Sequence, residues 1–101
     1  MPGGNMAAYV IVDMTVTDAV KIEEYRRLAG ASIAAHGGKF LVRGGRAEVL
    51  DGGWTPQRLV VIEFPGMEQA RRWRSSPDYG KACEIRDRAA QTRMILVEGI
   101  A

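Results

Sequence analysis

The sequence predicts an α+β domain in which four strands and two helical regions follow the order β-α-β-β-α-β. Four short runs are rich in β-branched and aromatic residues, a composition typical of strands. Two regions between them repeat apolar residues at spacings of three and four, as amphipathic helices do. This order is the split βαβ, or ferredoxin-like, arrangement: a four-stranded antiparallel sheet with helices on one face.

The first part of the chain predicts one strand and one long helix. Residues 7–14 are mostly β-branched or aromatic and too few for an ordinary helix. Thr17-Asp18 offers an N-cap, and the apolar stripe that follows predicts a helix to about His36. Gly37 suits the left-handed position that commonly ends a helix.

The middle of the chain predicts a β-hairpin. Residues 39–42 form its first strand, and residues 59–64 form its second. Gly44-Gly45 indicates a bulge or a close backbone approach, after which residues 47–50 are expected to continue the first strand. Asp51-Gly52-Gly53 is typical of a turn.

The last third predicts two consecutive helical stretches and a final strand. Residues 67–73 form a short helix that stops before Ser75. Ser76-Pro77 begins another helix, with serine as N-cap and proline at the first helical position. Residues 92–98 close the sheet.

Length and composition predict one ordinary domain. A chain of 101 residues forms a single core, so we expect a flexible extension over residues 1–5 and one domain over 6–101. No apolar run approaches the roughly 20 residues that span a membrane. Residues 1–5 also lack the features of a secretory signal, which together predicts a cytoplasmic protein without a membrane partner.

Several classes of chemistry find no support in the sequence. One histidine, His36, and one cysteine, Cys83, predict no metal site. Neither a G-x-G-x-x-G motif nor a P-loop is present, and we expect no cofactor. The net charge is +2 with basic and acidic residues interleaved, so no nucleic-acid partner is expected.

Both faces of the sheet are predicted to be buried. The strand over residues 59–64 places Leu59 and Val61 on one face and Val60, Ile62 and Phe64 on the other. A strand with one face in water would alternate apolar and polar residues. We therefore expect a second copy of the chain to cover the face that the helices leave open, which predicts a homodimer.

Four segments in order resemble the domain of unknown function family DUF1330, within the dimeric α/β-barrel superfamily. The similarity runs from about Met6 to Gly99. It is carried by residues 36–45 (HGGKFLVRGG), 54–65 (WTPQRLVVIEFP), 75–79 (SSPDY) and 86–89 (RDRA). The resemblance implies a homodimer whose two sheets face each other as a barrel, and it implies no established activity.

His36, Arg43 and Arg58 are the first candidate site residues. His36 is the candidate catalytic acid or base, although its position also suits a cation at a helix C-terminus. Arg43 and Arg58, on neighbouring strands, can clamp a carboxylate or instead form ion pairs. Strict strand alternation predicts that Arg43 shares one face with Lys39 and Leu41, opposite Phe40 and Val42.

Acids and aromatic residues complete the candidate site. Glu63 and Asp13 stand within apolar strands, where burial would raise a carboxyl pKa and partial solvation would not. Tyr79, with Trp54 and Trp73, can stack on an aromatic ligand or simply belong to the core or an interface.

Two functions remain open from the sequence. The first is a homodimeric domain that binds a small anionic or carbonyl-bearing molecule between helices and sheet, with His36, Arg43, Arg58, Glu63 and Tyr79 as binding residues. Such a domain can be a cofactor-independent enzyme, by analogy of fold alone. The alternative is a non-catalytic dimerisation or ligand-sensing module.

Overall fold

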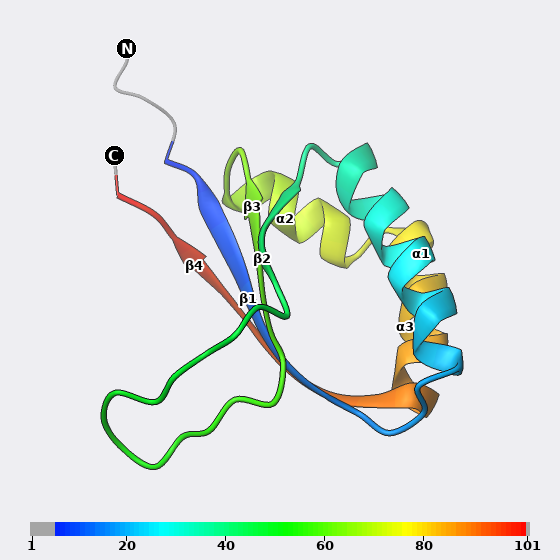
Figure 1. Ribbon diagram of the computed structural model, residues 1–101. Helices are drawn as coiled ribbons and strands as arrows, with labels where there is room; N and C mark the ends of the chain where they lie inside the picture. Colours follow the sequence, from blue (N-terminus) through cyan, green and yellow to red (C-terminus); the bar gives the residue numbers. More distant parts are fainter. Residues whose placement is uncertain (1–5, 101) are drawn as a thin grey trace.

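The computed structural model describes residues 6–100 and contains one antiparallel sheet with helices on one side (Figure 1). The strand order across the sheet is β2-β3-β1-β4. The predicted ferredoxin-like α+β fold is confirmed. The strands are β1 (Ala8–Val16), β2 (Lys39–Arg43), β3 (Leu59–Phe64) and β4 (Ala90–Glu98), and the helices are α1 (Lys21–Ala35), α2 (Met67–Arg74) and α3 (Pro77–Ala89).

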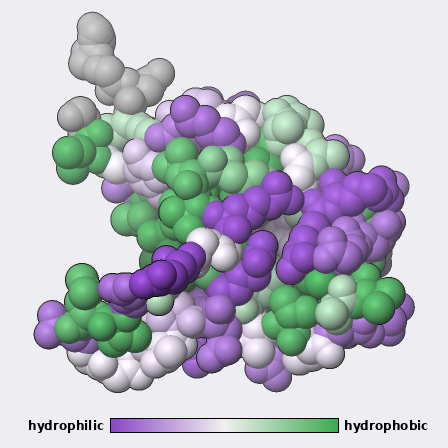
Figure 2. All heavy atoms as spheres, in the orientation of Figure 1, coloured by the Kyte–Doolittle hydropathy of each residue, from purple (hydrophilic) through white to green (hydrophobic). Residues whose placement is uncertain are grey.

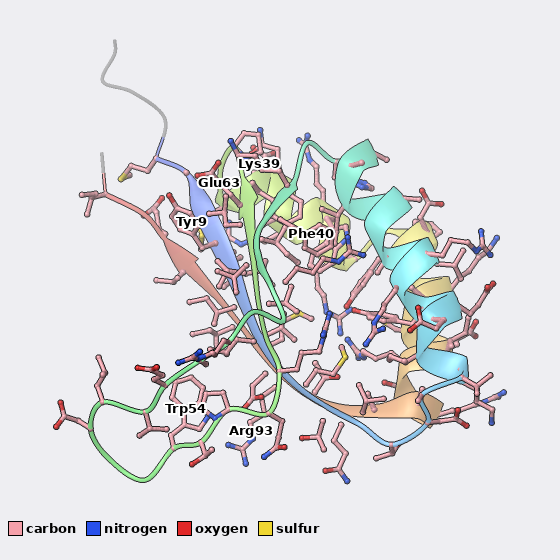
Figure 3. All side chains as sticks on the ribbon, viewed as in Figure 1. Tyr9, Lys39, Phe40, Trp54, Glu63 and Arg93 are labelled. Carbon is pink, nitrogen blue, oxygen red and sulfur yellow. The ribbon has the colours of Figure 1, made fainter. Side chains whose placement is uncertain are left out.

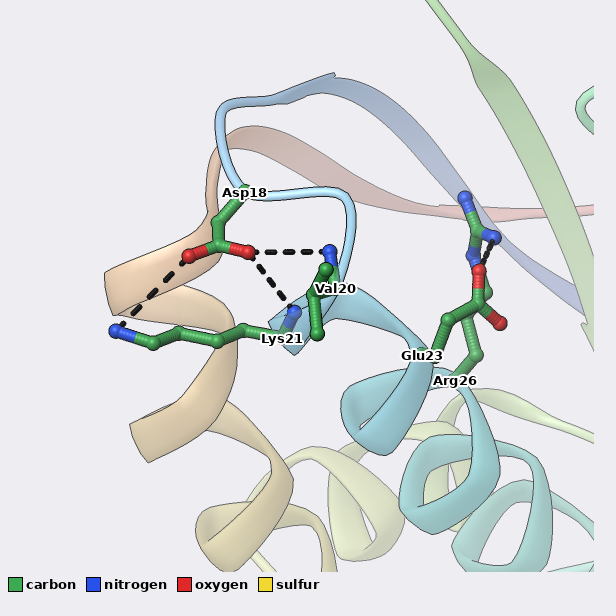
Figure 4. Close-up of polar contacts among 5 residues, drawn as sticks. All are labelled: Asp18, Val20, Lys21, Glu23 and Arg26. Carbon is green, nitrogen blue, oxygen red and sulfur yellow. Dashed lines mark hydrogen bonds and ion pairs between the residues drawn. The ribbon is translucent and has the colours of Figure 1, made fainter.

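The ends of α1 are defined by local hydrogen bonds. One carboxylate oxygen of Asp18 accepts from the backbone N–H groups of Val20 and Lys21, at 3.1 and 3.0 Å (Figure 4). At the other end, Gly37 has a φ of 79° and Gly38 donates to the carbonyl of Ile33 at 2.9 Å. This is a Schellman motif, which confirms that Gly37 ends the helix.

The hydrophobic core lies between the sheet and the helices. Alternate residues of β1, including Val10 and Val12, face the helices and are buried. Aromatic rings from three elements fill the centre: the ring centroid of Trp73 lies 4.1 Å from that of Tyr79 and 5.3 Å from that of Phe64. Close packing of these elements positions the helix layer over the sheet.

The β2–β3 hairpin differs from the predicted one in two ways. Residues 47–50 do not continue β2; they belong to a long irregular loop over residues 44–58. The bulge lies between Phe40 and Val42, upstream of the glycine pair. Because the bulge adds one residue, Arg43 pairs with Val60 and faces the helices with Phe40, so the predicted grouping of Arg43 with Lys39 was wrong.

The second face of the sheet points away from the helices. The loop over residues 44–58 projects on this side (Figure 1). Hydrophobic residues occupy the recess beside the loop (Figure 2). Ile95 on β4 is 61% exposed and Val97 is 42% exposed, which is unusual for large apolar side chains on a sheet.

Within residues 6–100, none of the helices has the length and apolar character needed to cross a membrane.

Candidate ligand-binding cavity

A cavity of about 40 Å³ lies between α1 and the sheet. Helix α1 packs against α3, and its inner face closes this cavity over the strands. The walls are largely apolar and come from six elements, with Val12, Met14, Ala29, Ile33, Phe40, Val60, Ile62, Trp73 and Met94. The polar residues of the wall are Tyr25 and three arginines, Arg26, Arg43 and Arg58, which we call the arginine cluster.

Arg43 reaches the cavity because of the β-bulge. Its guanidinium carbon lies 4.3 Å from the centroid of the Phe40 ring, on the helix side of the sheet. Figure 3 shows Phe40 directed toward the helices, whereas Lys39, Glu63 and Tyr9 gather at the other face. The cation–π contact leaves the N–H groups of the guanidinium able to donate to a ligand.

Arg58 is positioned by its own backbone and by a glycine. Its N–H donates to the Asp13 carboxylate at 3.4 Å, and its guanidinium packs against Gly44. A Cβ added at Gly44 would lie only 2.2 Å from a terminal nitrogen of Arg58. The glycine at position 44 therefore makes room for the arginine, and its φ of 72° directs the chain away from the sheet edge.

The arginine cluster concentrates positive charge. Desolvation by burial lowers the pKa of Arg58, and the charges of Arg26 and Arg43 lower it further, against a smaller opposite effect of Glu23. Arg26 forms an ion pair with Glu23 (Figure 4). Over residues 6–100, neither Arg43 nor Arg58 has a carboxylate within ion-pair distance.

The other three candidate residues do not line this cavity. His36 follows α1, where its Nδ1 lies 2.9 Å from the carbonyl oxygen of Ser32. Glu63 forms an ion pair with Lys39 at 3.2 Å on the opposite face of the sheet. Tyr79 is fully buried in the core, where its ring packs against that of Trp73. The structure therefore brings Arg43 and Arg58 together and separates them from His36 and Glu63.

Tyr25 and Arg26 were missed by the sequence analysis. Both residues lie within the helix predicted to end at about His36, and neither was named as a candidate site residue. A signal was present, since Arg26 follows Ile22 by four residues and precedes Ile33 by seven. Those spacings place Arg26 at the border of the stripe that faces the sheet.

The hydroxyl of Tyr25 connects the cavity to the interior of the helix layer. It lies 2.8 Å from the hydroxyl of Tyr79, to which Arg86 donates at 3.1 Å. Burial raises the pKa of Tyr25, against smaller opposing effects of Tyr79 and Arg86. Burial also raises the pKa of Tyr79, so both phenols stay protonated at neutral pH.

Comparison with known protein families gives one match. The model of the domain of unknown function DUF1330 matches residues 7–100. The chain belongs to the DUF1330 family. Comparison with curated proteins gives no significant match.

Solved structures with this fold extend the comparison of the DUF1330 domain. A protein of unknown function from Rhodopseudomonas palustris has a TM-score of 0.78 and 17% identity, over 96% of this chain and 85% of that one. SnoaB, a cofactor-independent oxygenase from Streptomyces nogalater, has a TM-score of 0.63 and 16% identity, over 97% and 96% of the two chains. A dimeric ferredoxin-like protein of unknown function from Thermobifida fusca has a TM-score of 0.62 and 18% identity, over 93% and 92%. At these identities the likeness concerns the fold.

A second and more open hollow of the DUF1330 domain, of about 820 Å³, lies on the far face of the sheet beneath the 44–58 loop. Trp54 of this loop donates from its indole Nε1 to the Asp13 carboxylate at 3.1 Å. Figure 3 shows Trp54 and Arg93 at this end of the sheet, away from the helices. The hollow and the cavity beneath α1 are therefore on opposite faces of the sheet.

Proposed function

We propose that this DUF1330 domain binds a small, largely apolar carboxylate in the cavity beneath α1, with Arg43 and Arg58 as the residues that bind the carboxylate. The observation that carries the proposal is that both guanidinium groups border an apolar cavity without an acidic partner among the described residues. A few convergent polar groups in an apolar cavity are typical of small-molecule sites. The space of about 40 Å³ is well below the usual volume of such sites, so the proposal requires the ligand to extend out of the cavity mouth or to displace α1 from the strands.

Electrostatics favours an anionic ligand over a neutral one. The arginine cluster places like charges close enough to lower the pKa of Arg58, and an anion between them relieves this repulsion. Guanidinium groups bind carboxylates through paired, charge-assisted hydrogen bonds. The apolar walls then accept the hydrocarbon part of the ligand.

Calorimetric titration with matched six-carbon probes tests this function. We expect hexanoate to bind, and hexanamide and hexylamine to bind at least tenfold more weakly, because a hydrogen bond to a charged group contributes about 1.5–3 kcal/mol. Arg43→Ala and Arg58→Ala should each remove most of the preference for hexanoate. Arg46→Ala is the matched control, since Arg46 is exposed and pairs with Glu48.

Equal affinity for the acid and the amide would contradict the proposal, as would a preference for hexanoate that survives both cavity variants. Cofactor-independent catalysis in the same cavity stays a prediction. It is tested by product analysis after incubation of the bound acids with the protein in air. The predicted cytoplasmic location and the predicted lack of nucleic-acid binding likewise stay predictions.

A second candidate function is self-association through the far face of the sheet. Exposed apolar side chains on this face and its loop favour it, notably Ile95, Val97 and Trp54. We propose that a second copy of the chain covers this face, packed sheet to sheet as in a dimeric α/β barrel. The fold is shared with the Thermobifida fusca protein, which is described as dimeric.

A further inference from the structure

The hydrogen bonds that end at Tyr25 have a direction set by Arg86. A guanidinium group donates hydrogen bonds and accepts none. The Arg86 Nη1 atom lies 3.1 Å from the Tyr79 hydroxyl, so the Tyr79 oxygen is the acceptor in this contact. The side chain of Arg86 is 11% exposed, which keeps this donor in place within the helix layer.

The Tyr79 hydroxyl must be the donor in its hydrogen bond with the Tyr25 hydroxyl. Tyr79 is 0% exposed, and among residues 6–100 its hydroxyl has hydrogen bonds to Tyr25 and Arg86 only. Arg86 cannot accept, so a Tyr79 proton that did not point at Tyr25 would be buried without an acceptor. That arrangement is unfavourable, because a buried donor without an acceptor has lost its hydrogen bond to water and gained none. The 2.8 Å bond therefore runs from the Tyr79 hydroxyl to the Tyr25 oxygen.

The hydroxyl proton of Tyr25 is left to donate a hydrogen bond to a molecule in the cavity. Tyr25 accepts from Tyr79, lines the cavity beneath α1, and has no acceptor for its own proton in the part of the chain that the structure describes, because the nearby Arg86 can only donate to it. The indole N–H of Trp73, the other buried donor in the wall, is already bonded to the Ser32 hydroxyl at 3.0 Å. Tyr25 thus supplies the available neutral donor in the buried part of the cavity.

We infer that Tyr25 recognises an acceptor oxygen on the ligand, and that the ligand is an oxo acid with a carbonyl group in addition to its carboxylate. The inference rests on the proposed carboxylate binding and deepens it. The carboxylate contacts the arginine cluster, and the carbonyl oxygen accepts from Tyr25. A carbonyl meets this requirement better than a second carboxylate, because a charge near Tyr25 would lose its hydration in a largely apolar cavity.

The test compares oxo acids with isosteres that lack the oxygen. The probes are 4-oxopentanoate, 5-oxohexanoate and 6-oxoheptanoate, each paired with the acid in which C=CH₂ replaces C=O. One hydrogen bond contributes about 0.5–1.5 kcal/mol, so wild-type protein should prefer the best-fitting oxo acid about two- to tenfold. Tyr25→Phe should abolish this preference and leave the preference for carboxylate over amide intact. Tyr9→Phe, on the opposite face of the sheet, should change neither.

The outcomes separate the two proposals. Binding of carboxylates without any carbonyl preference, or a preference that persists in Tyr25→Phe, would overturn the role of Tyr25 and leave carboxylate binding standing. Absence of binding by every acid would overturn both. A ligand-free measurement tests the direction of the bond: in protein with ¹³C-labelled tyrosine rings, the hydroxyl proton between the two phenols should correlate through bonds with Tyr79. Correlation with Tyr25 would overturn the inference.

Discussion

The carboxylate of Asp13 on β1 accepts a hydrogen bond of 3.1 Å from the indole nitrogen of Trp54 in the 44–58 loop. The same carboxylate accepts from the backbone N–H of Gln57 at 3.0 Å and from that of Arg58 at 3.4 Å. One acid therefore fixes the end of the loop on the far face of the sheet. It also fixes the backbone of an arginine whose side chain borders the cavity on the near face.

The hydrogen bonds that Asp13 accepts from the 44–58 loop, which we call the Asp13 anchor, should be lost at acid pH. The hydrogen bond from Trp54 lowers the Asp13 pKa below its ordinary value of 3.8, against desolvation and with help from the Gln57 and Arg58 N–H groups and the Arg93 charge. Because the folded-state pKa is depressed, the stabilisation is present above pH 3.8 and is lost as pH falls through the folded-state pKa. The Trp54 indole proton shift, followed by NMR, should be constant from neutral pH to about pH 4 and change below it.

Two variants separate this anchor from other acid titrations. Asp13→Asn should remove the titration of the Trp54 proton, whereas Glu48→Gln, which changes an exposed acid of the same loop, should preserve it. A midpoint at or above pH 3.8 would show that the carboxylate gains nothing from its partners in the folded state.

Self-association through the far face predicts a sharp difference between two exposed positions. Ile95→Asp places a charge within the proposed dimer interface, where its desolvation should abolish the dimer at micromolar concentration. Val20→Asp changes a residue that is 84% exposed beside the start of α1 and should leave the dimer intact. Light scattering measures both, and circular dichroism checks that both fold. A wild-type monomer at micromolar concentration would remove this candidate function.

The fold was predictable because periodicity reports which residues face a core. The β-branched and aromatic composition of β1 and β3 and the apolar stripe of α1 are local signals, because each depends on residues close together along the chain. The strand predicted over residues 47–50 was wrong because these residues have a strand-like composition but no neighbouring strand with which to pair. After Gly44, with a φ of 72°, the chain leaves the sheet edge and forms a loop.

The site was less predictable because it depends on distances between elements. A single bulge between Phe40 and Val42 reverses the face on which Arg43 lies, and no local pattern near it signalled that position. The cavity itself exists because α1 packs on α3 and leaves space over the strands. That space follows from side-chain volumes across the whole domain, so Tyr25 was indistinguishable in the sequence from a core residue.

Gly44 and Gly45 offer a matched pair for testing the arginine cluster without altering an arginine. Gly44→Ala introduces a Cβ 2.2 Å from an Arg58 nitrogen at a φ of 72°, so the Arg58 side chain must move and the backbone is strained by about 1 kcal/mol. We expect hexanoate affinity to fall about tenfold, as for Arg58→Ala, with a lower melting temperature. Gly45→Ala meets no atom within 4 Å and should change neither property. If Gly44→Ala binds hexanoate as tightly as wild type, the position of Arg58 against Gly44 does not matter for the ligand, and the carboxylate must bind elsewhere in the cavity.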